Sequence, residues 1–220
     1  MPSQTFHNLP SEKQDSLIKI AIAEFASQDY NSASISRIVR QAGIAQGSLY
    51  QYFANKKDLY LYLLELLGKT KIAFLQDNYP LEAKMDFFEY LSWVFEINLE
   101  FDAVYPALSK LGYRAFYGDV PFADPKVEQM KQAASDFIRQ IVIKGIDDGD
   151  IKPNIDRDLA VFVVETLSNA ISNYIPQKLR ISTDKLAQEG AASFDADAAQ
   201  DIFQELIKIL RFGLGDRPDN

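Results

Sequence analysis

Apolar residues recur every three or four positions through most of the 220-residue chain. This spacing is typical of amphipathic helices. It predicts a first helix that starts near residue 10, and longer helices over about 56–78, 84–101, 103–117, 126–145, 156–176 and 198–214. Together with two short helices between them, these segments predict an all-α protein of about nine helices.

The two short helices lie between residues 34 and 52. Ser34 is a good N-cap, and apolar residues follow it at the spacing of one helical face: Ile35, Ile38, Val39 and Ala42. Gly43 follows the last of them, where a left-handed conformation ends a helix at little steric cost. The next helix, 45–52, is apolar mainly at Leu49, and Asn55 with Asp58 nearly forms a capping box for a third helix. Two short helices joined by a glycine turn, with the second polar on its free face, predict a helix-turn-helix whose second helix enters the DNA major groove.

The run from Ile18 to Leu64, above all AGIAQGSLYQYFANKKDL, resembles the DNA-binding domain of the TetR/AcrR family of bacterial transcription regulators. The similarity covers about the first third of the chain. It implies phosphate contacts from Tyr50, Tyr52 and Lys56, and a backbone contact from Ser34. Ala45 departs from the family pattern, in which many members have Ser or Thr at this position to cap the recognition helix.

Base-edge contacts need side chains that can pair with a base. Glutamine can pair with adenine and arginine with guanine, so the candidates are Gln46, Ser48, Gln51 and Arg37. Gly47 would let the helix backbone approach the DNA closely. For any one of these side chains, the alternative is an uninvolved surface residue.

The net charge of −8 does not by itself favour a nucleic acid as partner. Residues 1–70, however, carry seven basic and six acidic side chains, so they have a net charge of +1, and the other 150 residues have a net charge of −9. An acidic body behind a locally basic face would direct DNA to that face.

We expect a helix-turn-helix domain over residues 1–55, a connecting helix over 56–79, and a ligand-binding and dimerisation domain over 80–220. Residues 1–9, which include the single histidine, His7, are expected to be a mobile arm. Ser11 and Gln14 resemble a capping box for the first long helix.

The second domain is rich in aromatic residues and could hold an apolar pocket with a few polar anchors. The alternative for each residue is plain core packing. The candidate lining residues are Phe88, Trp93, Phe95, Asn98, Tyr105, Tyr113, Phe116, Tyr117, Phe137, Glu165, Asn169 and Asn173.

The last two long helices carry more apolar surface than one packing face needs, which favours a homodimer built around a four-helix bundle. The candidate interface residues are Leu159, Phe162, Val163, Ile171, Tyr174, Ile202, Phe203, Leu206, Ile209 and Leu210.

These features predict a cytoplasmic DNA-binding transcriptional regulator with no cofactor or metal. It would be a homodimer on a pseudo-palindromic operator in double-stranded DNA, and a repressor released by a small aromatic or lipophilic ligand. There is no cysteine, no signal-peptide pattern and no apolar run long enough to span a membrane. The aspartates of 146–154 lack the spacing of a calcium loop. Two alternatives remain: an enzyme, although no cysteine and a single histidine leave Cys–His and Ser–His catalysis almost nothing to work with, and a helical ligand-binding protein without DNA binding.

Overall fold

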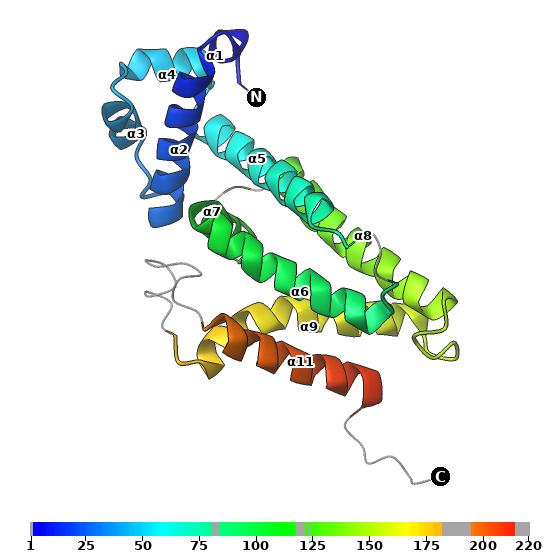
Figure 1. The fold of residues 1–220 in the computed structure, drawn as a ribbon. Helices are drawn as coiled ribbons and strands as arrows, with labels where there is room; N and C mark the ends of the chain where they lie inside the picture. The colour runs from blue at the N-terminus through cyan, green and yellow to red at the C-terminus, as the bar shows by residue number, and fades with distance from the viewer. Residues whose placement is uncertain (1, 81–83, 118–121, 123, 182–194, 214–220) are drawn as a thin grey trace, which may run out of the picture.

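A computed structural model describes residues 2–80, 84–117, 122, 124–181 and 195–213 of the chain. Within these ranges every regular element is a helix, which confirms the all-α class. Figure 1 shows a small group of helices at the N-terminal end and longer helices running away from it. The longer ones are α5 (Lys56–Asp77), α6 (Phe87–Val104), α7 (Pro106–Tyr117), α8 (Pro125–Asp147), α9 (Arg157–Lys178) and α11 (Ala196–Phe212).

The N-terminal group contains α2 (Ser11–Ser27), α3 (Ile35–Gln41) and α4 (Gln46–Tyr52). The predicted caps of α3 and of the following helix, α5, are confirmed. The Ser34 hydroxyl accepts the backbone N–H of Arg37 at 3.3 Å, and the Asn55 side chain accepts that of Asp58 at 2.9 Å. Gly43 has a φ of 66° in the turn between α3 and α4.

Two predictions at the N-terminus are wrong. Residues 1–9 are not an arm, because Gln4–His7 forms a short helix, α1, whose Phe6 is buried against Phe53. Ser11 does not cap α2. The N-cap residue is Pro10, and no side chain makes a capping hydrogen bond at this end of the helix. Gln14 instead donates to the carbonyl of Leu9 at 2.9 Å, so it fixes the turn between α1 and α2.

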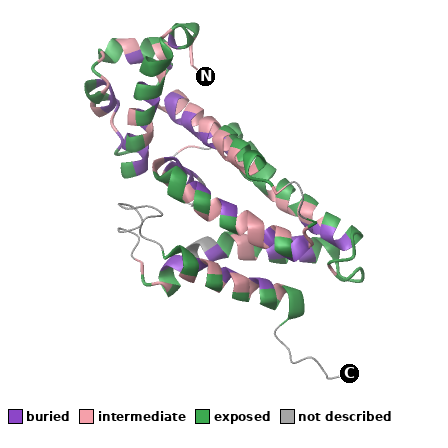
Figure 2. Cartoon of the chain, in the orientation of Figure 1, coloured by how far each residue is buried: buried purple, intermediate pink, exposed green. Residues whose placement is uncertain are grey.

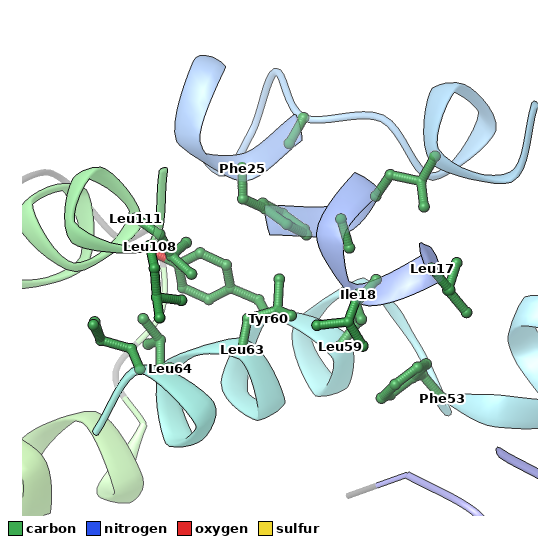
Figure 3. Packing of buried hydrophobic residues seen from close by; sticks show 14 of the residues in the cluster. Leu17, Ile18, Phe25, Phe53, Leu59, Tyr60, Leu63, Leu64, Leu108 and Leu111 are labelled. Carbon is green, nitrogen blue, oxygen red and sulfur yellow. The ribbon is translucent and has the colours of Figure 1, made fainter. Parts of the chain in front are cut away.

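The first hydrophobic core joins the N-terminal helices to α5 and α7. Leu59 and Leu63 of α5 pack among Phe25 of α2 and Leu111 of α7 (Figure 3). Burial raises the pKa of Tyr60 in this core to about 12, so its phenol stays neutral. The core crosses the sequence boundaries at residues 55 and 79, and it therefore connects the helix-turn-helix directly to the rest of the chain.

The second core lies between α6, α8, α9 and α11. Gly145 of α8 allows close approach of α6, because a Cβ at this position would lie 2.9 Å from three atoms of Phe87. The same end of α6 is held by the Asp150 carboxylate, which accepts the Phe87 N–H at 2.9 Å. The other aspartates of the 146–154 turn have different partners: Asp147 pairs with Arg157, and Asp148 pairs with Lys144.

The long helices follow their predicted ranges to within a few residues. The sequence also predicts a loose loop over residues 180–196, which are mostly polar or small, and a frayed end over 215–220, and both stretches fall almost wholly outside the described residues. Among the helices that the structure describes, none has both the length and the apolar content to cross a membrane.

Candidate nucleic-acid interface

Helix α4 offers nearly all of its side chains to solvent. Its one buried residue is Leu49, which is 1% exposed and anchors the helix to the first core. Tyr50 is 48% exposed, and Gln46, Gly47 and Gln51 are exposed as well. Figure 2 shows this helix at the far N-terminal end of the molecule, away from the bulk of the chain. A short polar helix in that place can reach a major groove without a clash from the larger domain.

Gly47 is not required by the packing of the domain. A Cβ added there would meet no atom within 4 Å, and its φ is not in the left-handed region. Packing within the described part of the chain therefore gives no reason for a glycine at this position. The neighbouring Gln46 is loosely held, since its side-chain oxygen accepts the Ser36 hydroxyl at 3.4 Å.

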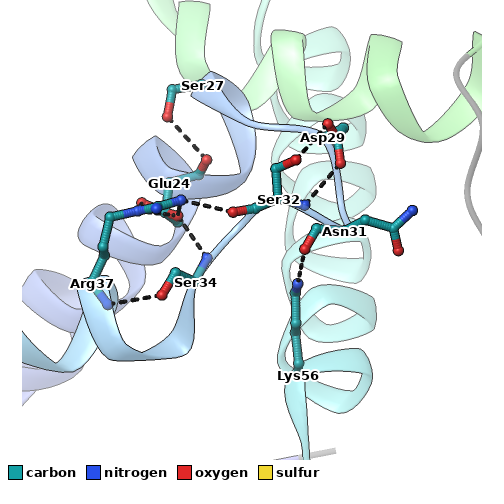
Figure 4. Close-up of polar contacts among 8 residues, drawn as sticks. All are labelled: Glu24, Ser27, Asp29, Asn31, Ser32, Ser34, Arg37 and Lys56. Carbon is teal, nitrogen blue, oxygen red and sulfur yellow. Dashed lines mark hydrogen bonds and ion pairs between the residues drawn. The ribbon is translucent and has the colours of Figure 1, made fainter.

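Arg37 is bound within the domain (Figure 4). Its guanidinium donates to the Glu24 carboxylate, with the shortest N–O distance at 2.5 Å, and to the Ser32 carbonyl at 2.8 Å. Glu24 also accepts the backbone N–H of Ser34 at 2.7 Å. The guanidinium is thus directed to α2, whereas the sequence had placed it among the base-edge candidates.

The pKa of Glu24 reflects this arrangement. Burial by itself raises that pKa, but the hydrogen bonds from Arg37 and the Ser34 amide, with the positive charge of Arg37, lower it below its ordinary value. Glu24 is therefore a buried carboxylate that stays ionised. It ties α2 to the N-terminal cap of α3.

Lys56 stands at the start of α5, beside the same network. Its ammonium donates to the Asn31 carbonyl at 3.1 Å and lies 4.7 Å from the centre of the Tyr30 ring. Burial lowers the pKa of Lys56, and the nearby carboxylates of Asp29 and Glu24 offset part of that effect. Tyr52, the second aromatic of α4, is only half-exposed because its ring packs near Phe6.

Helices α9 and α11 carry exposed apolar side chains. Five of the predicted interface residues lie at this surface, with Phe162 62% exposed: Leu159, Phe162, Val163, Tyr174 and Ile209. Ile202, Leu206 and Leu210 are half-buried. The prediction of an interface position is wrong for Ile171 and Phe203, because both are buried within the subunit. Phe203 stacks on Phe95 with ring centres 3.8 Å apart.

The predicted pocket residues are distributed over several packing groups. Phe88 and Phe95 belong to the second core, Trp93 packs on Tyr79 and Tyr90, and Tyr105 packs on Phe74 and Phe101.

Three of the remaining candidates do not fit a buried anchor. Phe137 and Asn169 are exposed, and the Asn98 amide donates to the Val94 carbonyl of its own helix. Tyr113 is exposed on one side but reaches Asp102, and Glu165 is half-exposed. The side chains of Phe116, Tyr117 and Asn173 are outside the described part of the structure.

Two partly buried charged residues, Asp102 and Lys71, were missed by the sequence reasoning. Asp102 of α6 accepts the Ser109 hydroxyl at 2.5 Å, and the Lys71 ammonium lies 5.5 Å from the adjacent Phe101 ring. Burial raises the pKa of Asp102 and lowers that of Lys71. The available signal was the presence of opposite charges on two long predicted helices.

Comparison with known proteins agrees with this geometry. Residues 17–63 match the profile of "Bacterial regulatory proteins, tetR family", and residues 85–214 match that of "Tetracyclin repressor-like, C-terminal domain". The crystal structure of a TetR family transcriptional regulator from Chloroflexus aurantiacus is 37% identical. It matches 99% of this chain over its own full length, with a TM-score of 0.78.

Two further similarities concern fatty acid regulators. The fatty acid metabolism regulator protein of Bacillus subtilis is 24% identical over 163 residues, which cover 72% of this chain and 81% of that protein. The structure of FadR from Bacillus subtilis with stearoyl-CoA shares the fold at 18% identity, with a TM-score of 0.65 over 91% of this chain and 99% of that one. Together the two profiles cover most of the chain. The chain therefore belongs to the TetR family of bacterial regulatory proteins.

Proposed function

We propose that this chain is a repressor that binds a pseudo-palindromic operator as a homodimer and leaves it when a small ligand binds. The observation that carries the proposal is the exposure of α4, whose only buried side chain is Leu49. The exposed face of this helix is free to meet the major groove, as the recognition helix of a helix-turn-helix does.

On this proposal, Gln46, Ser48 and Gln51 contact base edges, and Gly47 lets the backbone come close to the DNA. Tyr50, Tyr52 and Lys56 contact phosphates, and Ser34 contributes a contact near the start of α3. Phosphate contacts position the protein, whereas each good bidentate base contact contributes about 1–3 kcal/mol of discrimination. Arg37 acts indirectly, because its guanidinium holds Glu24 and the cap of α3.

The dimer forms through the exposed apolar side chains of α9 and α11, chiefly Phe162, Leu159 and Tyr174. Two such helices from each subunit make a four-helix bundle. A two-fold dimer places two copies of α4 on half-sites separated by about 34–36 Å, or a multiple of that distance.

The ligand is proposed to be lipophilic or aromatic and to bind in the domain formed by residues 85–214. Phe101, Tyr105 and Phe74 supply aromatic surface between α5 and α6, and Lys71 and Asp102 supply charge beside it. That the similar FadR structure holds stearoyl-CoA supports a lipophilic ligand. Because the first core is continuous from α7 to α2, a ligand that shifts α5 or α7 also shifts α4.

The test is a fluorescence-anisotropy titration of DNA fragments from the promoter region of the chain's own gene. We expect one fragment to bind specifically, with an affinity that falls steeply as salt is raised. Gln51→Ala should lower that affinity about tenfold or more without changing the affinity for unrelated DNA. Gln129→Ala, which changes an exposed glutamine of α8 outside the N-terminal helices, is the matched control. If no fragment exceeds unrelated DNA in affinity, the DNA-binding proposal fails, and a helical ligand-binding protein or an enzyme becomes the better reading.

A further inference from the structure

We infer that residues 3–6 supply the C-terminal cap of the recognition helix, and that the fit of this helix to DNA depends on that cap. The inference builds on the proposed DNA-binding function and assigns a positioning role to Ser3 and Phe6. Ser3 N–H donates to the Tyr52 carbonyl at 2.8 Å, and the Ser3 hydroxyl donates to the Gln51 carbonyl at 2.5 Å. These are two of the last carbonyls of α4, which have no partner inside their own helix.

Helix α4 needs support from outside because it has little of its own. It spans seven residues, and its N-cap, Ala45, has no side chain that can accept an N–H of the first turn. Isolated helices of fewer than about 12 residues are marginal in water, so tertiary contacts must hold such a helix. Leu49, which is buried in the first core, and a weak hydrogen bond from Ser36 of α3 to Gln46 give part of this support, and α1 contacts the C-terminal end of α4.

The Ser3 side chain forms hydrogen bonds with both α1 and α4. Its hydroxyl also accepts the Phe6 N–H at 3.4 Å and thereby caps α1 itself. One hydroxyl therefore donates to α4 and accepts from α1, and it joins the start of one helix to the end of the other. The turn that follows α1 is held to α2 by Gln14, so α1 is fixed at both of its ends.

Phe6 adds an aromatic contact that reaches two helices. Its ring centre lies 5.1 Å from that of Phe53, directly after α4, and 5.9 Å from that of Tyr62 in α5. Phe53 and Tyr62 also contact each other, at 5.5 Å. Phe6 thus fixes the end of α4 to the second turn of α5, the helix that leads into the larger domain. A change in that contact alters the angle at which α4 meets the groove, even when the fold persists.

The experiment compares full-length Ser3→Ala with Ser3→Thr, which keeps the hydroxyl, and with Thr5→Ala, an exposed residue of the same short helix. Amide hydrogen exchange of residues 49–53 is measured without DNA. We expect exchange there to be about tenfold faster in Ser3→Ala than in wild type, with α2 unchanged, and to remain near wild type in the other two variants. Phe6→Leu should produce the same local acceleration.

DNA titration of the same proteins supplies the second readout. Ser3→Ala should weaken specific binding about five- to tenfold, leave the affinity for unrelated DNA and its salt dependence unchanged, and leave the melting temperature within a few degrees of wild type. Unchanged exchange at residues 49–53 would overturn the inference, as would an equal loss in Thr5→Ala. If exchange accelerates as expected while wild type shows no specific DNA binding, the cap is upheld and the proposed function fails.

Discussion

Arg37 and Glu24 form a charged contact between α3 and α2, with 2.5 Å between the guanidinium and the carboxylate. The carboxylate side chain is 6% exposed and the guanidinium side chain 41% exposed. Glu24 therefore depends on Arg37 and on the Ser34 amide for its hydrogen bonds, and through them it sets the position of α3.

Removal of Arg37 should destabilise the domain rather than only weaken DNA binding. Arg37→Ala leaves the buried Glu24 carboxylate without its charged donor, and hydrogen bonds to charged groups contribute about 1.5–3 kcal/mol. We expect urea unfolding to show a loss of about 2 kcal/mol. The neighbouring exposed Arg40→Ala is the control and should lose less than about 0.5 kcal/mol. Equal stability of the two variants would contradict a structural role for Arg37.

The Arg37–Glu24 contact should also make the free energy of unfolding decrease at acid pH. The folded-state pKa of Glu24 lies below its ordinary value of 4.5, so its contribution is fully present above that value and is lost as the pH falls through the folded pKa. Glu24→Gln should remove this part of the acid dependence, although it lowers stability at neutral pH. The measurement is urea unfolding at several values from about pH 7 down to about pH 3. The exposed Glu12→Gln should follow the wild-type curve, and a parallel curve for Glu24→Gln would refute the assignment.

Gly145 should be intolerant of even a methyl group. A Cβ at this position would lie 2.9 Å from Phe87 Cβ, Cγ and Cδ2, so α6 and α8 would have to separate. Overpacking of this kind costs about 1–3 kcal/mol. Gly68→Ala is the matched control, because a Cβ there meets only Met130 at 3.7 Å and helix propensity favours alanine. Thermal unfolding should show a loss for the first variant and no loss, or a small gain, for the second.

The proposed dimer should depend on Phe162, which is 62% exposed on α9. Phe162→Glu places a charge within an apolar interface, so the dimer should dissociate at concentrations where wild type is fully dimeric. Sedimentation velocity at several concentrations measures this directly. Ile72→Glu on α5 alters a similarly exposed apolar residue outside that surface and should leave the dimer intact. A monomeric wild type would remove the two-fold operator from the proposal.

Apart from the failed cap at Ser11, the sequence was sufficient where structure depends on residues three or four positions apart. The caps at Ser34 and Asn55, the turn at Gly43 and the long helices are all set by local hydrogen bonds and by helical periodicity. The exposed polar residues of α4 could be predicted for the same reason, since one apolar residue in two turns leaves the other faces free.

Only the tertiary structure decided which distant residues meet. Phe6 lies in the segment that was predicted to be an arm, but its partners Phe53 and Tyr62 come from far along the chain. Arg37 lacked a visible partner because Glu24 lies 13 positions earlier, on another helix. Phe203 was predicted to lie at a dimer interface, but it stacks on Phe95 within the subunit. Periodicity shows which face of a helix is apolar, but packing between helices determines whether that face meets its own core or a second subunit.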